Sequence, residues 1–166
     1  GIQGGPLEHV IAAKAVMLHE AAQPAFHDYA HAIVSNAKVL AQSLLDEGLT
    51  LVTGGTDNHL MIIRLGDSGP TGKEVARAME RAGLVANANT VPGETRGAFQ
   101  TSGVRVGTPA ATTFGFGPDE FRTIGKLIAG IVRDPSNADV VKATAGAVRE
   151  LCHAVEARRE ASHAHR

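Results

Sequence analysis

The sequence has no tryptophan, a single cysteine, and few aromatic residues, which make up 4% of its 166 residues. Because Cys152 is alone, no disulfide can form within the chain, and we expect a reducing, cytoplasmic environment. No run of 18 uncharged apolar residues is present, so no membrane-spanning segment is predicted. The formal net charge of −1 gives no basic field that would attract nucleic acid. The remaining composition predicts a globular protein with an aliphatic, alanine-rich core.

Helical periodicity dominates the first third of the chain. Apolar residues recur at spacings of three and four over 7–22 and again over 25–47, and Pro24 separates the two runs. The sequence opens without methionine, inside a glycine-rich turn, so we interpret it as part of a longer protein. We predict that residues 1–48 are a helical segment whose alanine-rich first helix packs against something outside this chain.

From residue 49 the pattern changes to alternating strands and helices, which predicts a small α+β domain over 49–160. Thr71 and Glu74 have the spacing of a capping box that opens a helix ending at Gly83. The charged, histidine-rich tail should fray from about Arg158, with residues 161–166 outside the domain. The other predicted elements are strands at 49–53, 59–65, 84–88 and 104–106, a helix over 118–134, and a last helix capped by Asn137.

Arg105 stands on a predicted strand between Gly103 and Gly107. Glycines on a strand let another backbone or a ligand approach closely, and a guanidinium there can grip a carboxylate through two parallel hydrogen bonds. An edge-strand arginine that is merely solvated, or paired with a nearby aspartate, fits the same pattern and is the commoner case. The pattern therefore leaves both interpretations open.

Other candidate sites are weaker. Gly4 and Gly5 form a turn whose backbone amides could cradle an anion, although a plain tight turn fits as well. Residues 54–59 gather Asp, Asn and His, but turn capping explains them better than a metal, and no metal site is predicted. Ser102 has no recognisable base partner in the sequence, which argues against a serine nucleophile.

Five blocks, in order, resemble serine hydroxymethyltransferases. They are residues 3–16 (QGGPLEHVIAAKAV), 52–60 (VTGGTDNHL), 71–74 (TGKE), 85–92 (VANANTVP) and 101–109 (TSGVRVGTP). Any one block alone would be weak, whereas their order along the chain makes the resemblance specific. The chain thus resembles the C-terminal portion of this family, with Ala88 and residues 93–98 departing from its pattern.

The resemblance implies a fold-type I pyridoxal-phosphate transferase that interconverts serine and glycine, with tetrahydrofolate as one-carbon acceptor. Residues 1–48 would then be leading helices of the large cofactor domain. Arg105 would bind the substrate carboxylate, Asn89 would contact the folate, and Gly4 and Gly5 would lie by the cofactor phosphate of a neighbouring subunit in a homodimer.

The resemblance also implies that the cofactor lysine lies before this chain, and neither Lys14 nor Lys38 is placed to replace it. We therefore expect the chain to be inactive unless it joins the missing N-terminal part or a full-length subunit. Two alternatives stay open: a non-catalytic paralogue that binds and regulates or assembles a full-length subunit, and another fold-type I enzyme such as a threonine aldolase or an aminotransferase.

Overall fold

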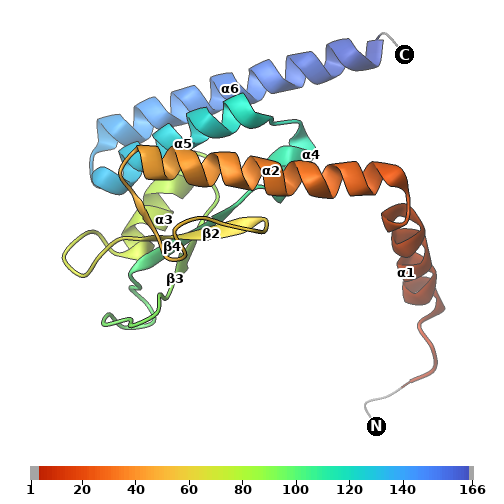
Figure 1. Ribbon diagram of the computed structural model, residues 1–166, viewed down its shortest axis with the longest axis horizontal. Helices are drawn as coiled ribbons and strands as arrows, with labels where there is room; N and C mark the ends of the chain where they lie inside the picture. Colours follow the sequence, from red (N-terminus) through yellow and green to blue (C-terminus); the bar gives the residue numbers. More distant parts are fainter. Residues whose placement is uncertain (1–3, 165–166) are drawn as a thin grey trace.

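Two helices joined at a proline open the described part of the chain, residues 4–164 of a computed structural model. Helix α1 spans Glu8–Ala21 and helix α2 spans Pro24–Asp46, as the apolar periodicity predicts. Pro24 starts α2, where its missing N–H is not needed. Helix α1 stands away from the rest of the molecule (Figure 1). Among the described residues, none of the helices combines the length and hydropathy that crossing a membrane requires.

The described residues form one four-stranded sheet, with the strand order β1-β2-β4-β3 and every pairing antiparallel. Because β2 and β3 both run antiparallel to β4, they are parallel to each other and are joined through helix α3 (Gly72–Arg81). The predicted unit of strand, helix and strand is present, with β4 inserted between its strands. The strands are β1 (Thr50–Leu51), β2 (Leu60–Arg64), β3 (Asn87–Asn89) and β4 (Gly103–Gly107).

Helices cover one face of the sheet and enclose the core. Helix α3 begins with the predicted capping box, because Thr71 Oγ1 accepts a hydrogen bond from the Glu74 amide at 3.2 Å and a Glu74 carboxylate oxygen accepts one from the Thr71 amide at 2.8 Å. Helix α5 (Pro118–Arg133) crosses α2 closely at Gly125, where an added Cβ would collide with Ser43. The largest fully buried side chains include Leu40, Leu44, Ile63, Val75, Val104, Phe121 and Ile131.

The second half of α2 is therefore part of the α+β core. Ala37, Leu40 and Leu44 are at most 1% exposed and belong to the same apolar cluster as the sheet residues. This packing differs from the predicted division at residue 48, which put the whole of α2 with the preceding segment. The periodicity identified the buried stripe of α2, but it could not show which neighbours bury it.

A short helix that the sequence analysis missed, α4 (Pro109–Phe114), ties α2 to the end of strand β4. The buried Thr108 hydroxyl donates to the Ile33 carbonyl at 2.9 Å, and the Asn36 amide donates to Thr112 Oγ1 at 3.0 Å. Tyr29 and Thr113 share a hydrogen bond of 2.7 Å. Residues of α2 from Tyr29 onward are thereby fixed to the helix that follows the Arg105 strand.

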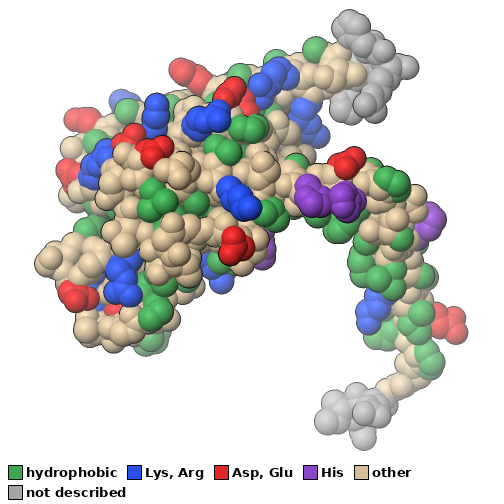
Figure 2. Space-filling model, viewed as in Figure 1, with side chains coloured by type: hydrophobic (Ala, Val, Ile, Leu, Met, Phe, Trp, Pro, Cys, Tyr) green, Lys and Arg blue, Asp and Glu red, His purple; other side chains and the backbone are tan. Residues whose placement is uncertain are grey.

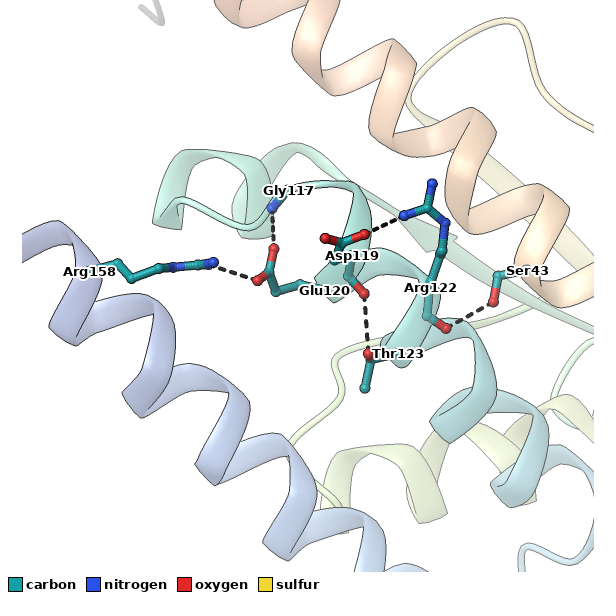
Figure 3. Close-up of polar contacts among 7 residues, drawn as sticks. All are labelled: Ser43, Gly117, Asp119, Glu120, Arg122, Thr123 and Arg158. Atoms are coloured by element: carbon teal, nitrogen blue, oxygen red, sulfur yellow. Dashed lines mark hydrogen bonds and ion pairs between the residues drawn. The ribbon is translucent and has the colours of Figure 1, made fainter.

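The last helix, α6, spans Ala138–Ala164 and is longer than predicted. Asn137 caps its start, as expected, by accepting hydrogen bonds from the amides of residues 139 and 140. The expected fraying from Arg158 does not match the helix, which continues through Ala164. Arg158 donates to Glu120 at 2.7 Å, and Glu120 also accepts from the Gly117 amide at the start of α5 (Figure 3). Local composition could not predict this contact, because Arg158 and Glu120 are 38 positions apart.

Candidate substrate-binding face

The face of the sheet that is turned away from the helices carries arginine and asparagine side chains that could bind a ligand. Strand residues alternate in direction, and residues directly opposite each other across a ladder share a face. Met61, Ile63, Val104 and Val106 point into the core and are buried. The side chains that point the other way define what we call the open face: Leu60, Ile62, Arg64, Asn87, Asn89 and Arg105.

Arg105 is exposed at the centre of the open face, on strand β4 between β2 and β3. Its strand is internal, so the interpretation of an edge-strand arginine is wrong. Its hydrogen-bonding partner is the neutral Asn87 side chain, whose Oδ1 accepts from Nη2 at 3.3 Å. A neutral partner orients the guanidinium without neutralising its charge, which suits it to receive an anion.

Asn89 lies on the same face as Arg105, two residues along β3 from Asn87 and opposite Gly103. Its Nδ2 donates to the Thr90 carbonyl at 2.7 Å. The structure thus brings together Arg105 and Asn89, which the resemblance assigned to two different ligands. They are diagonal neighbours across one antiparallel ladder, a relation that puts the two residues about 7–8 Å apart.

The glycine at position 103 serves the sheet itself. A Cβ there would stand 2.7 Å from Val91 Cγ1 and 2.8 Å from the Asn89 carbonyl oxygen. A Cβ on Gly107 would stand 2.9 Å from the His59 carbonyl. Of the two uses predicted for these glycines, close approach of other backbone is the one observed.

Arg64 is a second cation on the open face that the sequence analysis did not select. It is half-buried, faces Gly103 across the ladder, and donates from Nη2 to the Pro92 carbonyl at 2.8 Å. Alternation along 59–65 puts residue 64 on the same side as residue 62. Only the register of β2 against β4 shows that this side is also the side of Arg105.

The loop over 92–102 forms one border of the open face and is held by Glu94 and Arg96. Glu94 accepts hydrogen bonds from the Ser102 hydroxyl at 2.6 Å and from the Ser102 and Arg96 amides at 2.8 and 2.9 Å. These bonds, the Ser102 hydroxyl first, lower the pKa of Glu94 to about 2. Arg96 donates to the carbonyls of Asp67, Gly69 and Pro70. Residues 93–98, which depart from the pattern of the resembling family, are therefore fixed to the start of β4 and to the loop over 67–70.

The same geometry argues against a serine nucleophile. Ser102 is 1% exposed and its hydroxyl is bonded to Glu94. A carboxylate whose pKa is near 2 is a poor proton acceptor at neutral pH. Next to Ser102, Thr101 has a left-handed backbone conformation, with φ of 58°, which is unfavourable for a β-branched residue. The loop thus enters β4 through a strained residue.

The other predicted sites lie elsewhere. Gly4 and Gly5 precede the exposed end of α1, far from the sheet (Figure 1), while Gln3 lies outside the described residues. In residues 54–59, Thr56 Oγ1 donates to the Leu60 carbonyl and Asn58 Oδ1 accepts from the Leu60 amide, which is turn capping. Over residues 4–164, no group of three or more His, Cys, Asp or Glu side chains is arranged to hold a metal ion.

Comparison with known proteins agrees with the motifs. A family profile described as serine hydroxymethyltransferase matches residues 1–128. A serine hydroxymethyltransferase of Erythrobacter litoralis is 51% identical over 92% of this chain and 36% of its own length. Relatives of the same name from Acidiphilium cryptum and Haloarcula marismortui are 50% and 52% identical, over 92% and 91% of the chain. The chain spans little more than a third of the length of these relatives and corresponds to their C-terminal portion.

Proposed function

The chain belongs to the serine hydroxymethyltransferase family, and from this premise we propose that it supplies the substrate-binding part of a fold-type I pyridoxal-phosphate enzyme. The enzyme would interconvert serine and glycine, with tetrahydrofolate as one-carbon acceptor, and would contribute to glycine biosynthesis and one-carbon metabolism in the cytoplasm. The observation that carries the proposal is the placement of Arg105 and Asn89 on one open sheet face.

Arg105 is the proposed receptor for the carboxylate of the amino acid. Its planar guanidinium can donate two parallel hydrogen bonds to the two carboxylate oxygens, which fixes the orientation of the substrate as well as its position. The bond to the neutral Asn87 side chain holds the guanidinium on the open face. Asn89, diagonal to Arg105, is the proposed contact to the folate, because an amide can both donate to and accept from a heterocycle.

Pyridoxal phosphate, when bound, supplies the electron-withdrawing chemistry of the reaction. The proposed contribution of this chain to its binding is the glycine turn at Gly4 and Gly5, acting in the site of a neighbouring subunit of a homodimer. Among the described residues, nothing lies within 4 Å of where a Cβ on either glycine would stand. Their backbone can therefore be approached closely by a phosphate, which backbone amides bind well.

Apolar side chains are exposed on α1 and on Leu7, the residue that precedes it, and they support the proposal that a further part of the protein covers this helix. Leu7, Ile11 and Leu18 are 58–63% exposed, and a helix face of this kind is normally covered by another element. We propose that it packs against the remainder of the enzyme, so that the 166-residue chain alone is inactive.

A chimera tests this proposal. The chain would replace the matching 36% of the Erythrobacter litoralis relative, and conversion of serine to glycine would be measured with pyridoxal phosphate and tetrahydrofolate present. We expect turnover by the chimera and none by the 166-residue chain alone. Turnover by the isolated chain would overturn the proposed dependence on missing residues. A folded, dimeric chimera without turnover would favour the non-catalytic, assembling role.

A further inference from the structure

Two histidines outside the open face lie against each other on the exposed side of α2. His27 and His31 are separated by four residues, and their Nε2 atoms are 3.1 Å apart. The ring centroids are 4.3 Å apart, and both side chains face solvent, as the adjacent histidines on this part of α2 show in Figure 2. Neither residue has a part in the proposed function.

The separation of the two nitrogens suits a shared metal ion. Imidazole nitrogens ligate zinc and similar ions at about 2.0–2.1 Å, which puts two ligands of one ion about 2.9 Å apart at a right angle and about 3.3 Å apart at a tetrahedral angle. The observed 3.1 Å lies between these values. Histidines four residues apart on a helix project to one side, the arrangement found in helical zinc motifs.

The other ring nitrogen of His27 has a partner that favours the same use. Its Nδ1 lies 3.7 Å from the Asp28 carboxylate. This distance is too long for a hydrogen bond, but the nearby negative charge favours the His27 tautomer with the proton on Nδ1, as carboxylates do for metal-ligating histidines, and leaves the Nε2 lone pair for the metal. When an ion enters, the proton now shared between the two Nε2 atoms moves to an Nδ1 position, so no net charge is added to the rings.

From this geometry we infer that His27 and His31 form a two-nitrogen binding site for a divalent first-row transition-metal ion. Imidazole selects Cu²⁺, Ni²⁺ and Zn²⁺ over the hard ions Mg²⁺ and Ca²⁺, and affinity should be greatest for Cu²⁺. Water would complete the coordination, since no third protein ligand is grouped with the pair among residues 4–164. The two histidines stand two residues before and two residues after Tyr29, whose hydroxyl shares a hydrogen bond with Thr113 of α4.

The experiment is a titration of the tag-free, chelator-treated 166-residue chain with Ni²⁺, followed by calorimetry, with His163 and His165 replaced by alanine throughout so that the tail cannot compete. We expect one ion per chain. Because both nitrogens act together, His27→Ala and His31→Ala should each weaken binding by about 100-fold, and the double variant, which lacks both imidazoles, should bind at least as weakly as either single one. Mg²⁺ should give no heat of binding at the same concentrations.

Two matched controls make the result decisive. His153→Ala removes an exposed histidine on α6 and should leave the affinity unchanged. Moving the second histidine by one position, through His31→Ala with Ala32→His, keeps the histidine count but breaks the spacing, and should behave like His31→Ala alone. Retention of wild-type affinity in the shifted variant, or equal small losses for all three histidines, would overturn the inference. Far-UV circular dichroism should be the same for every variant, because the side chains at positions 27, 31, 32 and 153 are exposed.

Discussion

Helix α1 and the second half of α2 both carry apolar side chains, but only those of α2 are buried. Residues 4–28, which we call the arm, expose Leu7, Ile11 and Leu18 by 58–63%. In the body, residues 29–164, Leu40 and Leu44 are at most 1% exposed because α5 and the sheet pack on them. Leucine side chains thus form part of the core in the body, whereas in the arm they are exposed to solvent.

The difference shows what a helical pattern does and does not encode. Apolar spacing predicts which side of a helix seeks a partner, but the partner itself is set by the rest of the chain. In the body the partners follow within 100 residues. For the arm we propose that they lie in the part of the enzyme outside these residues. Substitutions matched between the two regions can break or sharpen this contrast.

The largest expected effect is in the body. Leu44→Ala leaves a cavity at a fully buried position and should lower the free energy of unfolding by about 2–5 kcal/mol. The same substitution in the arm, Leu18→Ala, should change it by less than about 0.5 kcal/mol, because Leu18 is 63% exposed. Urea unfolding followed by circular dichroism measures both. Equal losses would mean that the arm is packed in solution.

The crossing of α2 and α5 should be the next most sensitive point. Gly125→Ala places a methyl group against Ser43 and should cost about 1–3 kcal/mol of stability. Gly146→Ala, in α6, meets nothing within 4 Å among the described residues and should stabilise the helix by about 0.5–1 kcal/mol. Thermal melts of the two variants should therefore shift in opposite directions. A loss of stability in both would contradict the close crossing as the cause.

The loop beside the open face should respond to acid through Glu94. Its pKa is lowered from 4.5 to about 2 in the folded chain, so the ionised carboxylate stabilises the fold above pH 4.5 and this contribution is lost as the pH falls toward 2. Glu94→Gln should thus be less stable than the wild type at pH 7, by a margin that narrows at pH 3. Glu80→Gln, at an exposed position on α3, is the control. A margin independent of pH would show that ionisation of Glu94 is unimportant.

The smallest change in folding stability is expected when charged residues are introduced on the arm. These substitutions should instead change the self-association of the chain. The isolated chain should self-associate through α1, and Ile11→Glu with Leu18→Glu should make it monomeric in analytical ultracentrifugation. Val85→Glu alters an even more exposed apolar residue, at 92%, but in the body, and should leave self-association intact. Monomeric wild-type chain would contradict an uncovered arm.

Local chemistry predicted much of the fold. Pro24, the Thr71 and Glu74 capping box, and the Asn137 cap each act through neighbours within a few residues, so the sequence marked them correctly. The missed features depend on distant partners. Strand β3 begins at Asn87, later than predicted, because its extent is set by pairing with β4. The last turns of α6 are held by Glu120, and α4 by its bonds to α2.

The candidate site likewise has features that the sequence could predict and features that depend on distant partners. Arg105 could be selected because its flanking glycines are adjacent in sequence, and Asn89 because its block resembles a family. That the two share a face with Arg64 follows only from the register of three strands, which pairs residues up to 47 positions apart, such as Leu60 and Gly107. The hydrogen bonds of Glu94 to Ser102 likewise need the fold of the loop to be known.

The most direct measurement is the Michaelis constant for serine in the chimera with the Erythrobacter litoralis relative, before and after substitution of Arg105. Arg105→Ala should weaken serine binding by about 2–5 kcal/mol, because the substrate carboxylate would lose its charged partner. Arg105→Lys should recover little, since an ammonium group cannot form the paired bonds, and Arg77→Ala, at an exposed position on α3, should have no effect. A Michaelis constant for serine that is unchanged in Arg105→Ala would contradict the proposed carboxylate site.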